Sequence, residues 1–481
     1  MLLDMHGMFY DFPKGFTAQN TAGITPIASH LRYVPDFCDW KGRLVLATDE
    51  TSILQNPMAG RSQSNLWFGQ LDDLKEWGAP NGWGGIWMKD DVQSGVASDP
   101  FLINGFGRKV VHLSHDTGGE VKFALEISKK GANDWTEYKT VTVPATGYSY
   151  YIFPDNLSAN WIRVKTDKTC KASAFFHFQS KGHSPQTAQK VFSALADIED
   201  KNSFTVGLIR PAGHNKNLQF LDVSSKDSPI YYEVDEKLSF ERPSESRANE
   251  VAEIGTLKKE FELDEASVIV KDKSGTFRLP KTSVNYDRPF AAGWPRDRRE
   301  LESERYMFNV HGTFYEVPRD AGFSAIRPIT THKKKIFDFC TWRGLVVLSG
   351  ASKAAKNDGH YFRDSQNNSG LWFGAIDDLW KLGKPVGEGG VWKDSEVKAN
   401  ETSLPYLMTG YDKKKVRLTA DRDAEFTLQV DFEHDGWHTC QKIKVPAGKA
   451  IVHEFPEGFN AHWVRLISNQ DVKATAWFTY Q

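Results

Sequence analysis

LWFGQLDDLKEWGAPNGWGGIW, residues 66–87, and LWFGAIDDLWKLGKPVGEGGVW, residues 371–392, are two versions of one segment. They are identical at 13 of 22 positions, with no gap and an offset of 305 residues. Self-similarity of this kind indicates an internal duplication, and it has to be settled before any secondary structure is assigned.

The duplication extends outward from this segment in both directions. Three further pairs of segments follow in the same order: HGMFYDFP (6–13) with HGTFYEVP (311–318), DFCDWKGRLVL (36–46) with DFCTWRGLVVL (338–348), and FPDNLSANWIRV (153–164) with FPEGFNAHWVRL (455–466). Copy 1 therefore spans residues 6–179 and copy 2 spans residues 311–481. Residues 180–310 match neither copy.

Within each copy the dominant pattern is a two-residue alternation of apolar and polar side chains. It occurs in short runs such as RLVLATDE (43–50), VKFALEIS (121–128) and KATAWFTY (473–480), which turn signals separate. This pattern is typical of half-buried antiparallel strands. Helical turns are expected only near residue 187 and near residue 296.

The sequence predicts an all-β fold. Radial repetition of sheets leaves few exposed strand edges, so we expect one β-propeller over residues 1–481. Seven blades are expected, with six and eight as alternatives. The first strand either pairs with the last strands to close the ring or marks a truncated start.

Composition excludes several classes of protein. The formal net charge of −2 lacks the basic excess of a nucleic-acid binder, and no apolar run is long enough to span a bilayer. Four scattered cysteines form no metal or disulfide pattern. No cofactor motif occurs, although a structural or charge-neutralising cation stays an open alternative. A soluble protein is expected, with export an alternative if the start is trimmed.

The start of copy 2 concentrates residues capable of proton transfer. Strand alternation in HGTFYEVP places His311 and Tyr315 on one face, where an imidazole and a phenol can act as base and acid. Arg327 stands where copy 1 has Thr25. A difference between copies marks an asymmetric activity, so His311, Tyr315 and Arg327 are the candidate catalytic residues. Hydrogen bonding between blades is the structural alternative for the two residues that both copies share.

Other candidates are expected to bind the substrate. They are His332, His360 and Arg363 in copy 2, together with Arg296 and Trp294 in the unmatched middle. Guanidinium groups such as that of Arg296 can clamp a carboxylate or sulfate. Tryptophans without a counterpart in the other copy, namely Trp83, Trp294 and Trp380, are candidates for a flat platform on which a ligand stacks.

Carboxylates offer a second chemistry. Glu316 and Asp338 could serve as the pair of a glycoside hydrolase. The adjacent acids Asp72-Asp73 and Asp377-Asp378 are instead interpreted as turn or loop caps, because neighbouring residues of a strand diverge.

In its layout of strands and turns the chain resembles bacterial β-propeller proteins that act on polysaccharides, among them glycoside hydrolases and polysaccharide lyases. HGTFYEVP, DFC-x-W and LWFG-x-x-DDL resemble segments of such proteins. The resemblance implies a pairing of His or Tyr proton transfer with an Arg that neutralises a uronate carboxylate, for which His311, Tyr315 and Arg327 have the residue types. Asp-box repeats are lacking, which argues against the sialidase-like branch.

The predicted function is cleavage of an acidic polysaccharide or oligosaccharide by β-elimination. A glycoside hydrolase and a non-catalytic propeller that binds a glycan or a protein are the alternatives.

Overall fold

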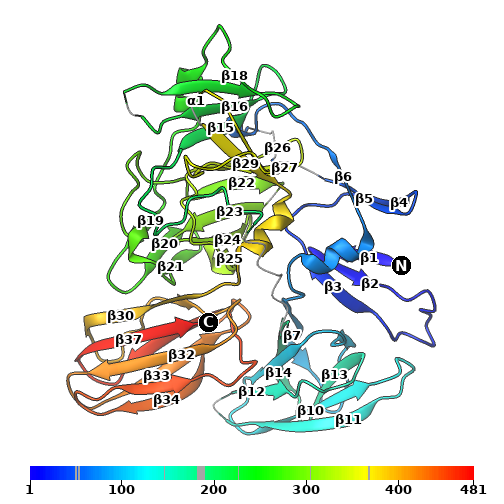
Figure 1. The fold of residues 1–481 in the computed structure, drawn as a ribbon. Helices are drawn as coiled ribbons and strands as arrows, with labels where there is room; N and C mark the ends of the chain where they lie inside the picture. The colour runs from blue at the N-terminus through cyan, green and yellow to red at the C-terminus, as the bar shows by residue number, and fades with distance from the viewer. Residues whose placement is uncertain are drawn as a thin grey trace.

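The computed structural model describes residues 1–48, 51, 55–145, 147–180, 190–225, 227–303, 305–366 and 369–481. Antiparallel strands dominate these residues (Figure 1), which confirms the all-β prediction. One α-helix, α1 (Ala248–Ile254), accompanies the 3-10 turns η1 (Pro57–Ala59), η2 (Leu71–Glu76), η3 (Val284–Tyr286), η4 (Gly322–Ala325) and η5 (Ile376–Leu382). Within the described ranges, no helix combines the length and apolar character that a membrane crossing demands. The helical turn expected near residue 296 is wrong, because a strand begins at Arg298. The turn expected near 187 falls largely outside the described residues.

Five sheets consist of strands that are close in sequence. Sheet 1 contains β1 (Leu2–Met5), β2 (Met8–Asp11) and β3 (Thr25–Ser29), and sheet 2 contains β4 (Phe37–Trp40), β5 (Arg43–Ala47) and β6 (Leu66–Gly69). Sheet 3, in the unmatched middle, contains β15 (Gly207–Pro211), β16 (Leu218–Asp222), β17 (Ile230–Val234) and β18 (Phe240–Glu241). Sheet 4 contains β22 (Arg298–Glu302), β23 (Arg305–Val310), β24 (Thr313–Pro318) and β25 (Arg327–Thr331). Sheet 5 contains β26 (Phe339–Trp342), β27 (Leu345–Leu348), β28 (Tyr361–Arg363) and β29 (Gly370–Gly374).

The rest of each copy is a pair of sheets with interleaved strands. Sandwich 1 joins the order β11-β10-β13-β8 to the order β12-β9-β14-β7, with β7 (Gly82–Val92), β8 (Phe101–Leu102), β9 (Arg108–His115), β10 (Val121–Ser128), β11 (Thr136–Val143), β12 (Tyr148–Phe153), β13 (Trp161–Thr166) and β14 (Cys170–Gln179). Sandwich 2 repeats these orders with β30 (Gly387–Val397), β31 (Tyr406–Leu407), β32 (Lys414–Ala420), β33 (Ala424–Asp431), β34 (His438–Val445), β35 (Ile451–Glu454), β36 (Trp463–Ser468) and β37 (Val472–Tyr480). A meander of β19 (Phe261–Leu263), β20 (Val268–Asp272) and β21 (Gly275–Leu279) extends one sheet of sandwich 2 through a parallel pairing with β31.

The sandwiches differ from the predicted blades. A blade is a meander, whereas Phe123 of β10 and Phe176 of β14 lie on different sheets and meet in one core. The last strand pairs with β30 and β32, and the first strand pairs with β2, so the two ends do not share a sheet. Of the two interpretations of the first strand, its pairing with the last strands is therefore wrong.

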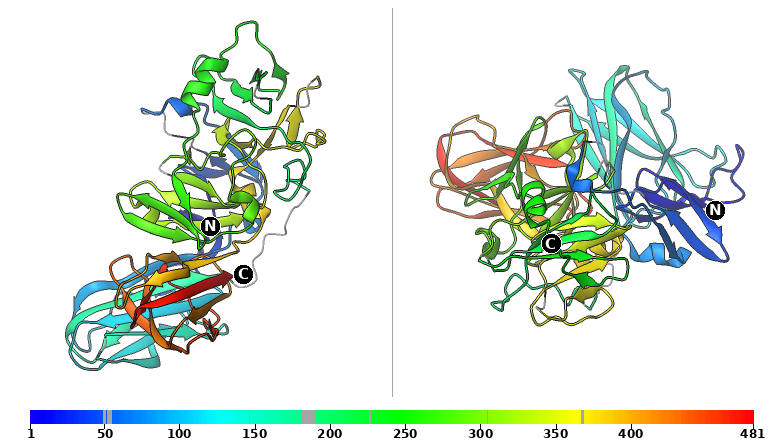
Figure 2. Two further views of the ribbon diagram at one scale, coloured as in Figure 1. Left: turned by 90° about the vertical axis from the view of Figure 1, so that its left-hand side faces the viewer. Right: turned by 90° about the horizontal axis from the view of Figure 1, so that it is seen from above.

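Apolar faces stack sheets 3, 5 and 4 in that order. One face of sheet 5 shares a core with sheet 3, and the other shares a core with sheet 4. Sheets 1 and 2 share a smaller core of their own. The two sandwiches lie side by side at one end of the molecule, and sheet 3 lies at the opposite end (Figures 1 and 2).

Candidate functional site

A cleft with a volume of about 220 Å³ lies where copy 1 meets copy 2. Copy 1 lines it with the end of β3, the segment that enters β7 and the end of β14. Copy 2 lines it with the start of β25, the end of η5 and the loops that contain Thr409–Asp412 and Asn460. Each copy supplies part of the wall, so the cleft exists only because the duplicated halves pack together.

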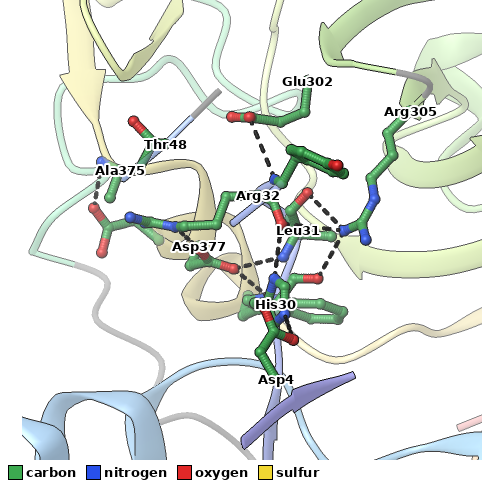
Figure 3. Close-up of polar contacts among 12 residues, drawn as sticks. Asp4, His30, Leu31, Arg32, Thr48, Glu302, Arg305, Ala375 and Asp377 are labelled. Carbon is green, nitrogen blue, oxygen red and sulfur yellow. Dashed lines mark hydrogen bonds and ion pairs between the residues drawn. The ribbon is translucent and has the colours of Figure 1, made fainter. Parts of the chain in front are cut away.

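A polar junction holds these two walls in place (Figure 3). Arg32 of copy 1 forms a buried ion pair with Asp377 of copy 2, with Nε 2.6 Å from Oδ2. The backbone amide of Leu31 donates to the other oxygen of Asp377 (2.8 Å). Arg305 donates to the carbonyls of His30 and Leu31 (3.2 and 3.0 Å). These bonds fix the loop after β3 directly beside the cleft.

Two tryptophans form aromatic walls. Trp83 stands near the start of β7 and packs against the rings of His177, His434 and His462. Trp380 lies in η5, and its indole N–H donates to Asp377 (3.3 Å). A side chain on Gly78 would overlap the Trp380 ring, so the bare glycine backbone allows this close approach across the copies. Neither tryptophan has a counterpart in the other copy, which is why the sequence indicates both as candidates for a ligand platform.

Charged side chains at the cleft come from copy 2. Arg327 donates to Glu316, and Lys384 lies 3.5 Å from Asp412. Burial alone would raise the pKa of Glu316, but Arg327 and Arg305 hold it below its usual value. Copy 1 carries Thr25, Ala79 and Gly107 at the positions of Arg327, Lys384 and Asp412. Sequence reasoning missed Lys384 and Asp412, although the same comparison of copies would have found them.

Five histidines lie behind Trp83, between the sandwiches. His112, His177 and His462 are buried, His438 is half-buried and His434 is exposed. Three of them donate to backbone carbonyls, His112 to Asn460 (2.7 Å), His177 to Phe432 (2.9 Å) and His462 to Ile326 (2.9 Å). Burial lowers the pKa of His177 to about 3 and that of His438 to about 4. His112, His177 and His462, whose pKa values burial lowers, are therefore neutral structural donors.

The structure does not bring the three predicted catalytic residues together. His311 lies in the turn before β24 with φ of 51°, so strand alternation does not reach it. Its Nδ1 accepts from the amide of Thr282 (2.8 Å), its Nε2 donates to Asp287 (3.1 Å), and burial lowers its pKa to about 4.

Tyr315 and Arg327 occupy opposite faces of sheet 4. Arg327 pairs across the strands with Glu316, the neighbour of Tyr315, and successive strand residues point to opposite sides. Tyr315 is fully buried in the apolar core, which raises its pKa to about 12. Among the three, Arg327 is the residue that lines the cleft.

The predicted substrate-binding residues lie apart from one another. His332 donates to Asn309 (2.9 Å), and His360 stacks on Trp372 and donates to the carbonyl of Phe373 (2.9 Å). Arg363 ends β28 opposite Gly370. Arg363 is the last residue of a strand of sheet 5, His360 lies in the loop before that strand, and His332 directly follows the last strand of sheet 4.

The two candidates from the unmatched middle, Arg296 and Trp294, also lie away from the cleft. Arg296 is buried in an ion pair with Asp338, and Trp294 packs edge-on against Phe261 under Lys259.

The proposed hydrolase carboxylates are likewise occupied. Asp338 is fully buried, pairs with Arg296 and Arg299, and accepts from the amide of Ile209 (2.9 Å). Glu316 is paired with Arg327. Across the ranges that the structure describes, no group of three or more His, Cys, Asp or Glu side chains is placed to hold a metal ion.

Comparisons with known proteins identify no family. No family model matches, and no curated protein matches. Among solved structures, the PBSX exported protein XepA is 7% identical, with 83% of this chain and 86% of that chain covered and a TM-score of 0.17. A CBM4 structure is 12% identical over 31% of this chain and 78% of that chain, with a TM-score of 0.11. Procruciferin, an 11S globulin from Brassica napus, is 9% identical over 94% and 83%, with a TM-score of 0.16. At these TM-scores the likenesses carry no argument about fold or function.

Proposed function

We propose that the chain binds an acidic saccharide in the cleft between its two copies. The observation that carries this proposal is the convergence of Trp83 and Trp380 with Arg327 and Lys384 in one cavity. Indole rings offer flat apolar surfaces to the C–H face of a sugar, and the two cations can pair with its carboxylate. A concave wall that combines apolar surface with convergent polar groups is typical of a ligand site.

The geometry favours binding over β-elimination. A general base must lie within hydrogen-bond reach of the proton that it removes. The predicted base and acid, His311 and Tyr315, are buried in other parts of sheet 4 and its flanking loops. Of the histidines that contact Trp83, His177 and His462 use their N–H groups on backbone carbonyls, and His434 does not line the cleft. The charged residues lining the cleft are Arg327, Lys384 and Asp412, and Asp412 is paired with Lys384.

The experiment is calorimetric titration with a panel of uronic-acid oligosaccharides. Trp83→Ala and Trp380→Ala are expected to weaken binding at least tenfold each, since each removes one stacking surface. Arg327→Gln is expected to weaken binding of acidic sugars while sparing their neutral analogues. Trp135→Ala is the matched control, because its ring packs under Arg163 in sandwich 1 and lines no part of the cleft.

Two results would count against this function. One is the absence of binding across the panel. The other is unchanged affinity in both tryptophan variants. Following the same mixtures by absorbance for an unsaturated product tests the predicted cleavage directly, and an enzyme that loses product formation in His311→Ala would restore that prediction in place of ours.

We also infer that sheets 3, 5 and 4 are blades of a partial propeller. Support comes from their first strands, since β26 runs next to β15 on one side and next to β22 on the other. Convergence of first strands is the geometry of a propeller axis. In this interpretation the sandwiches are attached to the array at one end and contribute no blades.

A further inference from the structure

The outer face of sheet 2 is apolar and exposed. We define this face by Cys38 and Trp40 of β4, Val45 of β5, and Leu66 and Phe68 of β6. Cross-strand pairing of Cys38 with Val45 and of Val45 with Phe68 places them on one side of the sheet. Trp40 and Leu66 are each 52% exposed, and Phe68 is 41% exposed. Contiguous exposed side chains of this size mark an interaction surface.

Copy 2 contains the same face with the same five residue types. They are Cys340, Trp342, Val347, Leu371 and Phe373, none of which is more than 3% exposed. Sheet 3 covers them with a matching apolar face made by Ile209, Leu218, Phe220, Tyr232 and Val234. The indole N–H of Trp342 also donates to a carbonyl of the same segment, that of Lys216 (3.1 Å). In Figure 1 sheet 3 lies over sheet 5, whereas β4 and β5 lie at the periphery.

In copy 2, packing within the chain explains the five apolar residues. In copy 1, it does not. A free sheet surface gains nothing from Trp, Leu and Phe and becomes less soluble with them. The duplicated chain keeps all five residue types, and in copy 1 all of them except Val45 are exposed. Their retention indicates a cover supplied from outside the molecule.

Charged residues at the border of the face indicate that a second molecule of this chain is the cover. Asp36 precedes the Cys38–Trp40 run at one end of β4, and Arg43 lies opposite Trp40 at the other end. Two such faces stacked with their strands antiparallel bring the acidic end of each against the basic end of the other. This arrangement is the isologous contact of a two-fold dimer.

We propose that the outer face of sheet 2 is the interface of a homodimer, in which two copies of the chain pack sheet 2 against sheet 2. Sheet 3 of a second chain is not free to serve, because its apolar face is buried against its own sheet 5. The contact repeats the sheet-on-sheet packing that sheets 3 and 5 make within one chain. It does not depend on the saccharide cleft, which lies between the copies of a single chain.

The test is sedimentation velocity across a concentration series of the full chain. The unmodified protein is expected to form dimers as concentration rises. Trp40→Asp and Phe68→Asp are expected to remain monomeric, and their exposure means that the fold survives, as circular dichroism checks. Val452→Asp is the control, since Val452 is 55% exposed on sandwich 2, away from this face.

Two further measurements make the assignment specific. Arg43→Asp is expected to weaken dimerisation, and the double variant Asp36→Arg with Arg43→Asp is expected to restore it. Labelling of the Cys38 thiol is expected to slow as dimers form. A protein that stays monomeric up to its solubility limit, with Cys38 labelled at a constant rate, would overturn the proposal, as would dimers that persist in both aspartate variants.

Discussion

The ion pair between Arg32 and Asp377 is shielded from water at both ends, with side chains that are 2% and 0% exposed. Removing one partner of such a pair leaves a buried charge without compensation. We therefore predict that Arg32→Ala lowers the free energy of unfolding by about 3–5 kcal/mol, the usual cost of that defect. Urea denaturation at neutral pH measures it.

The duplication supplies the control for this prediction. Asp72 occupies the position of Asp377 in copy 1 but is exposed and pairs with Lys75. Exposed ion pairs contribute little because solvent screens them. Lys75→Ala is expected to leave stability unchanged within error. Equal effects of the two substitutions would show that the buried pair has no special role in joining the copies.

At the scale of single residues the sequence predicted some roles correctly. Asp73 and Asp378 lie in the first part of their 3-10 turns and cap them by accepting from the amides of Gln70 (2.7 Å) and Ala375 (2.9 Å), as predicted. Their neighbours Asp72 and Asp377, included in the same prediction, form ion pairs with Lys75 and Arg32 instead. The difference between copies singled out Arg327, which lines the cleft, while the catalytic role expected for it stays a prediction. His311 failed because the two-residue alternation holds only within a strand, and a turn residue with positive φ takes its direction from tertiary contacts.

The junction between the sandwiches makes stability sensitive to acid. Burial lowers the pKa of His177 to about 3 and that of His438 to about 4, against 6.5 in an unfolded chain. Below pH 6.5 the unfolded chain binds protons on these histidines and the folded chain does not. The free energy of unfolding therefore has its full value above that pH and decreases as the pH falls. Each histidine contributes a slope of about 1.4 kcal/mol per pH unit between the two pKa values. Burial raises the pKa of Asp431 to about 6, and this carboxyl opposes the trend in the same range.

His177→Gln tests this element directly. An amide can still donate to the carbonyl of Phe432 but cannot be protonated. The dependence of unfolding free energy on pH between 6 and 4 is expected to flatten by about one proton, or about 1.4 kcal/mol per pH unit. His6→Gln is the comparison, because His6 is exposed and belongs to no such junction. A slope that the His177 substitution leaves unchanged would contradict a buried neutral imidazole.

At the scale of elements, strands could be predicted but not their partners. Alternation in VKFALEIS correctly indicates β10, and RLVLATDE and KATAWFTY indicate β5 and β37 in the same way. A strand in a sandwich and a strand in a blade have the same local pattern, because each buries one face. Long-range pairing decides between them. For example, β10 pairs with β13, although β12 lies between them in sequence and belongs to the other sheet. The cleft was hidden for the same reason, since its walls are about 300 residues apart in sequence.

Considered as a whole, the molecule uses its two copies unequally. Copy 2 is the buried half, with its sheet 5 enclosed by sheets 3 and 4 and its Asp338 and Asp377 in ion pairs. Copy 1 presents the equivalent of one of these faces, the outer face of sheet 2, to solvent, while its other face packs on sheet 1. The face of sheet 5 therefore makes its contact inside the chain, with sheet 3, whereas the equivalent face of sheet 2 is available to another chain. The unmatched middle segment creates this inequality, because it supplies sheet 3 once.

That inequality predicts the consequence of loosening sheet 3. Phe220 is fully buried between sheets 3 and 5, and Phe220→Ala leaves a cavity that weakens their contact by about 3–5 kcal/mol. A chain whose sheet 5 is uncovered carries two equivalent adhesive faces in different orientations, so its contacts no longer close after two subunits. Sedimentation is expected to show species larger than a dimer, and the Cys340 thiol, buried in the unmodified protein, is expected to react with maleimide. Leu208→Ala is the control, since Leu208 packs on the opposite side of sheet 3, near α1. If Cys340 becomes exposed but no larger species form, the two faces are not equivalent as docking surfaces. The five shared residue types would then be insufficient for docking, and the geometry of the sheet would also be required.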